Sequence, residues 1–304
     1  MNYFKIMRPS HWTKNVFVFA ALIFGKKLLA SPHEVFLSFA AALGGFFCFS
    51  LASSAIYIFN DIVDRQTDRL HPEKSSRPIA SGEIPVGNAL IMSVLCAAVA
   101  VIAGFSIVRE LGAIIVVYIL LMVLYSLLLK RVMILDCVVI SIGFCLRAIA
   151  GAVVVGVFIS PWLVICTFAL CLFMSFGKRR SEIEMLGDVS DSFRRTLAGY
   201  TPELLAHMID VTSGLAIVCF LLYTMDDRTL RIFGTNNLVY TTPLVLYCIF
   251  RFSALIQKGR FSGPVGLILK DRPFQIGLLL WVISCIAVIY SSKLIDVFGD
   301  VWAY

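Results

Sequence analysis

Charged residues are scarce in this sequence. Asp, Glu, Lys and Arg together account for 15% of the 304 residues, whereas hydrophobic residues account for 60%. Because a soluble globular domain usually carries about 25% charged residues, this composition excludes an ordinary soluble protein. It predicts an all-α, polytopic protein that is embedded among membrane lipids.

The sequence also lacks the residue patterns of several common site types. None of the nine cysteines forms a C-x-x-C pair and all lie in apolar segments, so neither zinc ligands nor disulfides are expected. The four histidines are scattered, and no Cys/His or Ser/His pair indicates a catalytic nucleophile. The net charge of +7 lies mostly in short loops and no DNA-binding motif is present, so nucleic acid is not an expected partner.

Long apolar segments dominate the chain. A membrane-crossing helix needs about 20 apolar residues, and nine segments qualify: 14–31, 36–59, 86–107, 111–129, 134–156, 160–177, 203–225, 237–256 and 273–294. The first is the weakest, because Lys26 and Lys27 fall inside it. Basic residues precede it as in a signal peptide, but no clean cleavage site follows, so we expect a retained span. Residues 1–304 are thus expected to form one integral-membrane domain with nine transmembrane helices.

The basic residues predict the orientation of these spans. One set of loops contains 18 Lys and Arg residues, and the opposite set contains six. The rule that cytoplasmic loops are enriched in Lys and Arg places the first set, with the N-terminus, in the cytoplasm. Every polar cluster of note belongs to that set, so we expect a cell (inner) membrane protein whose central cavity opens to the cytoplasm.

The most informative polar cluster follows the second span. Asp61, Asp64 and Asp68 are spaced by three and four residues, and Asn60 lies one helical turn before Asp64. On a helix this spacing places the three carboxylates on one face, where a hard divalent cation with oxygen ligands would neutralise them. Mg²⁺ is the natural candidate, and it usually arrives with a phosphate. The alternative is a solvated acidic helix end just outside the membrane.

Several basic residues near this stretch could have either a structural or a ligand-binding role. Arg77, with Lys74, either anchors its loop to lipid headgroups or binds an anion held by the metal. Lys130, after Tyr125, suits a helix C-terminus in any case. Arg147 shares a helix face with Asp136 but lies roughly 16 Å deeper. So deep an arginine either forms a structural ion pair with Asp136 or the Asp61 region, or lines a substrate cavity.

The sixth span ends in Lys178-Arg179-Arg180 and leads into a long polar loop, from Glu184 to Thr201. Three basic residues at a cytoplasmic helix end are ordinary topology signals. The loop, however, is longer than a simple connector, which suggests a lid or a ligand-facing surface.

Nine spans with N-D-x-x-D-x-x-x-D after the second one resemble the UbiA superfamily of intramembrane prenyltransferases. The stretch Arg8-Pro9-Ser10-His11-Trp12-Thr13-Lys14-Asn15 is similar to the R-P-x-x-W-x-K-N opening of its decaprenyl-phosphate phosphoribosyltransferase branch. Five regions strengthen the similarity to that branch: Tyr125–Lys130 with Asp136, Leu146–Gly151, Gly177–Arg179, Tyr200–Leu205 and Lys270–Arg272. The resemblance implies Mg²⁺-dependent transfer of 5-phosphoribose from phosphoribosyl diphosphate to a polyprenyl phosphate.

The region before the seventh span bears on the choice of donor. Superfamily members that use a prenyl diphosphate carry a second Asp-rich motif there, whereas this chain has Lys178-Arg179-Arg180. Basic groups in place of metal-binding acids suit additional phosphates without a metal of their own. The alternative within the fold is prenyl transfer from a prenyl diphosphate to an aromatic acceptor. A transporter is a third interpretation, disfavoured because the polar residues gather on one side of the membrane.

These patterns assign a role to each candidate residue. The predicted metal ligands are Asn60, Asp61, Asp64 and Asp68. The predicted catalytic residues are Asp61, Asp64, Lys130 and Arg147. The predicted substrate-binding residues are Lys14, Asn60, Asp68, Arg77, Tyr125, Asp136, Lys178 and Arg179. The sequence leaves the lipid chain length and the oligomeric state open.

Overall fold

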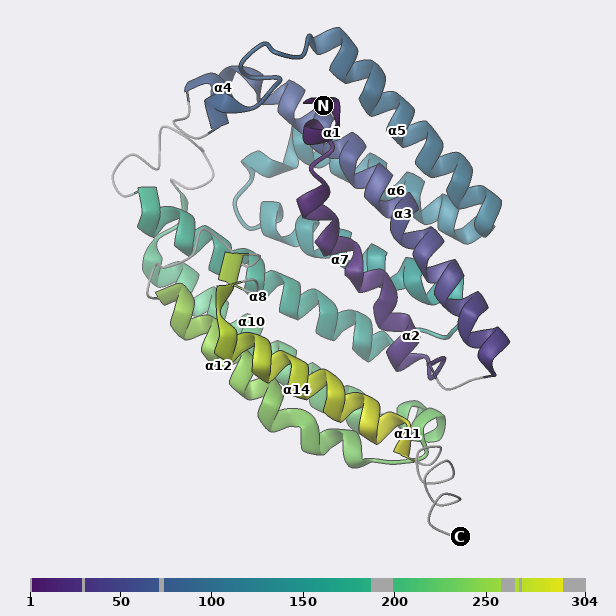
Figure 1. Ribbon diagram of the computed structural model, residues 1–304. Helices are drawn as coiled ribbons and strands as arrows, with labels where there is room; N and C mark the ends of the chain where they lie inside the picture. Colours follow the sequence, from purple (N-terminus) through teal and green to yellow (C-terminus); the bar gives the residue numbers. More distant parts are fainter. Residues whose placement is uncertain are drawn as a thin grey trace. The chain divides into compact units, whose positions relative to one another are not determined.

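The computed structural model of the protein describes residues 2–28, 31–70, 74–186, 199–257, 266–267 and 270–291. These residues form helices and no strands, so the all-α prediction is confirmed (Figure 1). By their contacts the described residues divide into two compact units. Residues 2–22 and 36–158 form the first unit, and the described parts of 23–35 and of the chain from 159 onward form the second. The prediction of one domain over 1–304 stays a prediction.

The first unit is built from one long helix and three that follow it. Its α-helices are α1 (Asn2–Ile6), α3 (Pro32–Val63, which begins in the second unit), α4 (Arg65–Leu70), α5 (Val86–Ile107), α6 (Arg109–Leu127) and α7 (Leu135–Val155). Three 3₁₀ helices accompany them: η1 (Pro9–Phe19), η2 (Lys74–Ser76) and η3 (Leu129–Arg131). Helix α5 packs on α6, α6 on α7, and α7 on η1 (Figure 1).

The second unit contains a short helix and a set of long ones. Its helices are α2 (Ala20–Phe24, shared at its start with the first unit), α8 (Pro161–Leu186), α10 (Pro202–Met225), α11 (Asp227–Phe233), η6 (Asn237–Thr241), α12 (Thr242–Gln257) and α14 (Arg272–Ile289). Helix α8 packs on α10 and α12 packs on α14. Side-chain caps define where the helices begin: Thr201 accepts a hydrogen bond from the backbone N–H of Leu204, and Asp271 accepts one from Phe274.

Among the residues that the structure describes, eight helices are long and apolar enough to cross a membrane. They begin at Pro32, Val86, Arg109, Leu135, Pro161, Pro202, Asn237 and Arg272, which matches eight of the nine predicted spans. Helix α5 shows how they face their surroundings, because Ile91, Leu95 and Ile102 are each more than half exposed. A row of large exposed apolar side chains on a helix of this length is the surface that lipid covers. The protein is therefore an integral, multi-pass membrane protein.

The first predicted span, 14–31, has a different backbone. Residues 14–24 belong to the 3₁₀ helix η1 and the five-residue helix α2, rather than to one long α-helix, and residues 25–28 are not helical. Gly151 of α7 shows how closely η1 packs. A Cβ atom added there would overlap the backbone of Val18, lying 2.8 Å from its carbonyl carbon. The two backbones are in direct contact, so η1 is fixed by steric packing as well as by hydrogen bonds.

Gly151→Ala is expected to destabilise the first unit by about 1–3 kcal/mol, because the added methyl group must push η1 away from α7. The matched control is Gly87→Ala in the first turn of α5, where an added Cβ meets nothing within 4 Å. Thermal unfolding of both variants in detergent measures the difference. An unchanged unfolding temperature for Gly151→Ala would contradict the close packing of η1 on α7.

Candidate active site

The acidic stretch lies where α3 passes into α4, and its backbone stays helical there. The N–H of Asp64 donates to the carbonyl of Asn60 at 2.9 Å, and the N–H of Asp68 donates to that of Asp64 at 2.8 Å. Because a helix turns once every 3.6 residues or so, Asp61 and Asp68, seven positions apart, point in nearly the same direction. Asn60 and Asp64, four apart, form a second pair. Asp64 also lies four positions before Asp68, so the three carboxylates stay near one face, and it is their different side-chain partners that divide the stretch into two adjacent pairs.

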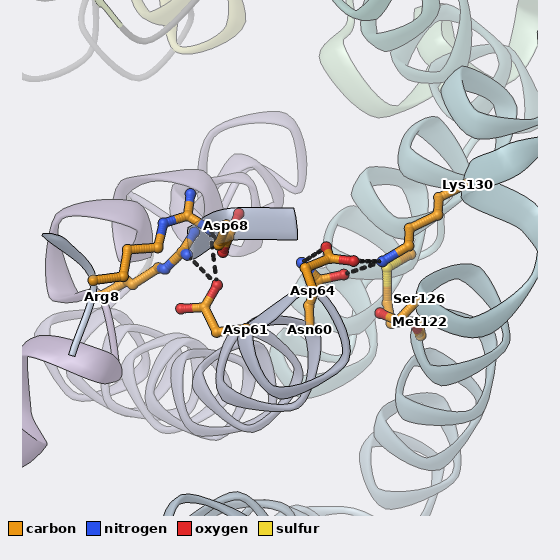
Figure 2. Close-up of polar contacts among 9 residues, drawn as sticks. Arg8, Asn60, Asp61, Asp64, Asp68, Met122, Ser126 and Lys130 are labelled. Carbon is orange, nitrogen blue, oxygen red and sulfur yellow. Dashed lines mark hydrogen bonds and ion pairs between the residues drawn. The ribbon is translucent and has the colours of Figure 1, made fainter. Parts of the chain in front are cut away.

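The first pair, Asp61 and Asp68, is neutralised by two arginines. Arg8 donates to Asp61 at 2.5 Å, and Figure 2 shows its side chain reaching across to the acidic pair. Arg77 donates to Asp61 at 3.1 Å and to Asp68 at 2.6 Å. Both carboxylates are buried, so two guanidinium groups face two carboxylates with little water between them. Burial of the pair depends on this compensation.

The second pair, Asn60 and Asp64, meets Lys130 of η3. The Lys130 ammonium donates to Asp64 at 2.5 Å and to the side-chain oxygen of Asn60 at 3.2 Å. Asn60 in turn donates to the other Asp64 oxygen at 2.9 Å, which closes the group (Figure 2). The structure therefore brings together six of the predicted site residues: Asn60, Asp61, Asp64, Asp68, Arg77 and Lys130.

The donor atoms of these pairs fit Mg²⁺. Carboxylate and amide oxygens are its preferred protein ligands, and one or two carboxylates commonly suffice when substrate phosphates complete the coordination. A ready-made cluster of three His, Cys, Asp or Glu side chains is absent from the described residues. The assignment of one ion to all four of Asn60, Asp61, Asp64 and Asp68 stays a prediction.

The N-terminal segment runs along α3 and binds it residue by residue. Arg8 reaches Asp61, the indole N–H of Trp12 donates to Ser54 at 3.0 Å, and the side chain of Asn15 donates to Ser50 at 3.1 Å. Later residues of the segment thus meet earlier residues of α3, so the two run in opposite directions.

The predicted substrate-binding residue Lys14 belongs to the same segment. Its ammonium lies 5.9 Å from the centre of the Tyr57 ring, and the Arg8 guanidinium lies 5.4 Å from that centre. Tyr57 stands one turn before Asp61 on α3. Two cations therefore lie against the same aromatic ring close to the acidic pairs.

Arg147 is buried in a setting of neutral groups. Its Nε donates to Asn15 at 2.7 Å, Nη1 to the carbonyl of Gly143 at 2.7 Å, and Nη2 to Tyr118 at 2.8 Å and Ser53 at 3.1 Å. The Tyr118 ring centre lies 4.7 Å from the guanidinium carbon. None of these partners is a carboxylate, so among the described residues the suggested ion pair with Asp136 or the Asp61 region is not formed. Asp136 itself is fully buried at the start of α7, and Tyr125 is half-buried on α6.

The predicted basic residues of α8 pair with an acid on the same helix. Arg179, 1% exposed, donates to Glu182 at 2.5 Å, and Lys178 lies 3.6 Å from the same carboxylate. On α12, Arg251 forms a two-pronged ion pair with Asp271, at 3.1 and 2.9 Å. Hydrogen bonding from Arg251 holds the pKa of the Asp271 carboxyl below its usual value. The predicted lid, from Glu184 to Thr201, falls largely on 187–198, outside the described residues.

Several contact residues were missed by sequence reasoning about the site. Arg8 and Asn15 belong to the stretch that carries the family resemblance, so that stretch was the available signal. Ser53 gave no signal, because a serine in an apolar helix usually bonds the carbonyl of the preceding turn. Tyr118 gave none, because a single tyrosine in an apolar segment does not by itself indicate a polar contact. Their partners lie 94 and 29 positions away in the sequence.

Comparison with known proteins agrees with the resemblance. The model of the UbiA prenyltransferase family matches residues 16–263. A decaprenyl-phosphate phosphoribosyltransferase of Mycolicibacterium smegmatis is 31% identical over 296 residues, which cover 95% of this chain and 92% of that protein. A protein of the same name from Corynebacterium glutamicum is 32% identical over 291 residues, covering 94% and 86%.

A solved structure shares the fold. The structure of a UbiA homolog from Archaeoglobus fulgidus bound to GPP and Mg²⁺ has a TM-score of 0.70 at 20% identity, covering 95% of this chain and 99% of that one. The family match extends over most of the sequence. This chain therefore belongs to the UbiA prenyltransferase family.

Proposed function

We propose that this protein transfers 5-phosphoribose from phosphoribosyl diphosphate to a polyprenyl phosphate and releases diphosphate. The observation that carries the proposal is the gathering of Arg8, Arg77 and Lys130 around the acids at the end of α3. A diphosphate donor that binds together with a cation needs carboxylates to hold the cation and positively charged side chains to hold the phosphates. The names of the relatives from M. smegmatis and C. glutamicum support the same reaction.

Mg²⁺ would be held by Asn60, Asp61, Asp64 and Asp68. When bound, it would make the diphosphate a better leaving group by neutralising its charge. The Mg²⁺ bound to the A. fulgidus homolog supports the use of a divalent cation in this fold. Around it, Lys14, Arg77 and Lys130 share the remaining charge of the phosphates.

The reaction breaks the bond between the ribose anomeric carbon and the diphosphate oxygen. That carbon gains oxocarbenium character, and an oxygen of the lipid phosphate attacks from the opposite face. The lipid phosphate is already anionic at neutral pH, so no side chain has to remove a proton from it. The protein's contribution is therefore positioning and charge neutralisation. Lys178 and Arg179, which both form ion pairs with Glu182 in the structure, are proposed to bind a phosphate.

We propose a cytoplasmic location for this site, in a cavity of a cell (inner) membrane protein with a cytoplasmic N-terminus. The excess of basic residues in one set of loops, 18 against six, supports that orientation. A ninth crossing is proposed for η1 and α2. Eleven residues of 3₁₀ helix followed by five of α-helix extend for roughly 30 Å, the thickness of the hydrocarbon core.

The second candidate function is prenyl transfer from a prenyl diphosphate to an aromatic acceptor. It is favoured by the family's name and by the GPP bound to the A. fulgidus homolog. It is disfavoured by Lys178, Arg179 and Arg180, which stand where a second acidic motif would be needed.

One assay separates the two functions. Purified protein with Mg²⁺, radiolabelled phosphoribosyl diphosphate and polyprenyl phosphate is expected to form a labelled lipid, and EDTA is expected to abolish it. The control supplies a prenyl diphosphate and an aromatic acid instead. Product from that pair, with no use of phosphoribosyl diphosphate, would replace the proposed function by the second one.

A further inference from the structure

Arg8 and Arg77 occupy one oxygen of each of the two buried carboxylates that are predicted to bind a metal ion. Both donate to the same Oδ1 atom of Asp61, and Arg77 also donates to Oδ2 of Asp68. A carboxylate oxygen has two lone pairs, so this Oδ1 atom is already fully used. A cation cannot bind there without displacing at least one arginine.

The charges of the exchange are balanced. Asp61 and Asp68 carry two negative charges and the two arginines carry two positive ones. A divalent cation brings the same charge as both guanidinium groups together, so it can take their place and leave the buried pair neutral. A single monovalent cation could not replace both arginines, because one buried carboxylate would stay uncompensated.

The backbone of Arg8 makes it the easier of the two to displace. Arg8 has φ 53° and ψ 60°, a left-handed conformation at the start of η1. For a residue with a Cβ atom this conformation costs about 1–2 kcal/mol. Its ion pair with Asp61 and its position over Tyr57 offset that cost. The backbone strain therefore cancels part of the free energy gained from the Arg8–Asp61 ion pair. A cation that displaces Arg8 from Asp61 has to replace only the remainder.

We propose that Arg8 and Arg77 compete with a divalent cation for Asp61 and Asp68, and that the displaced arginines donate to the phosphates that accompany the cation. The inference rests on the proposed function for the identity of those phosphates. Guanidinium groups bind phosphate oxygens in the same two-pronged way as carboxylates. Cation and diphosphate are thus expected to bind more tightly together than separately, which couples metal binding to the arrival of the donor.

The competition can be measured with Mn²⁺ and purified protein, without any donor. Binding is followed by the electron paramagnetic resonance signal of free Mn²⁺. Arg8→Gln and Arg77→Gln are each expected to bind Mn²⁺ about tenfold more tightly than the wild type, or tighter still, because one competing charge is gone. Arg109→Gln is the matched control, since Arg109 is an exposed arginine at the start of α6. Wild-type affinity in both variants would overturn the proposal.

A second measurement uses the unaltered protein, so it does not depend on the folding of a variant. Phenylglyoxal modifies accessible arginines, and mass spectrometry reports each site. Saturating Mn²⁺ is expected to raise the modification rates of Arg8 and Arg77 severalfold and to leave Arg109 unchanged. Added inorganic diphosphate should lower them again. Rates that do not respond to Mn²⁺ would overturn the proposal.

Neither measurement depends on lipid product. If both succeed but no labelled lipid forms, the competition stands and the proposed function fails. If labelled lipid forms but both measurements fail, only the competition is lost.

Discussion

Replacing Asp64 with asparagine is expected to lower the rate of phosphoribosyl transfer by about 10³-fold while the protein stays folded. The side chain of Asp64 is 30% exposed, against 5% for Asp61 and 7% for Asp68, so it is the carboxylate most open to an incoming diphosphate. Asparagine keeps the shape of the side chain and one acceptor oxygen, so it can still accept from Lys130 but no longer accepts from Asn60 as well. It removes the negative charge that a hard divalent cation requires. Losing one group that stabilises developing charge typically costs about 10²–10³ in rate.

Three measurements test this expectation: formation of labelled lipid, the dependence of the rate on Mg²⁺ concentration, and thermal unfolding. Glu110→Gln is the matched control, because Glu110 is an exposed acid in the first turn of α6, and it should transfer at the wild-type rate. Transfer at the wild-type rate by Asp64→Asn would remove Asp64 from catalysis. The same result with Asp61→Ala and Asp64→Ala combined would remove the whole metal assignment.

Most of the fold could be predicted from the sequence because lipid imposes a simple rule. A helix that crosses the hydrocarbon core satisfies all of its backbone hydrogen bonds internally, so each long apolar run implies one helix. The rule describes eight spans correctly and also predicts a long helix over 14–31, where the structure has η1 and the short helix α2 instead. Apolar content gives the length of a segment but does not separate α from 3₁₀ geometry. Here the choice depends on Asn15, Val18 and Gly151, which form contacts between distant parts of the chain.

The candidate site was predictable only where it is local in sequence. The helical spacing predicts that Asn60, Asp61, Asp64 and Asp68 lie near one another at the end of α3. It does not divide them into two pairs, because Asp64 is four positions from both Asn60 and Asp68. The partner of each pair comes from elsewhere. Arg8 is 53 positions from Asp61, and Lys130 is 66 positions from Asp64. Nothing in the periodicity of one helix indicates which distant side chain faces it.

Arg147 shows a limit of another kind. Its depth in a span predicted a charged partner, since a lone charge in the membrane is expensive. The structure compensates it instead with four hydrogen bonds and nearby aromatic rings. Neutral hydrogen-bond acceptors and aromatic rings together stabilise the delocalised guanidinium charge. A search of the sequence for an oppositely charged partner cannot predict such an arrangement.

This arrangement leads to the second large expected effect. Arg147→Lys and Arg147→Met should both lower phosphoribosyl transfer by about 10²-fold. Arg147 joins Asn15 of the N-terminal segment to Ser53 of α3 and Tyr118 of α6. A lysine keeps the charge, but its ammonium cannot donate in the fork geometry that reaches these partners. The segment that carries Arg8 and Lys14 would then shift, and a displacement of about 1 Å at a site can cost about 10²-fold in rate.

The two substitutions together decide how Arg147 acts. If it positions the segment, Lys and Met variants lose similar activity, and hydrogen exchange in Met7–Val18 rises in both. Arg109→Lys, at an exposed position of the same unit, should change neither the rate nor the exchange. A fully active Arg147→Lys beside an inactive Arg147→Met would show instead that the positive charge itself is required. Arg147 would then act on a bound anion through its field, and its hydrogen bonds to Asn15, Ser53 and Tyr118 would matter little for the reaction.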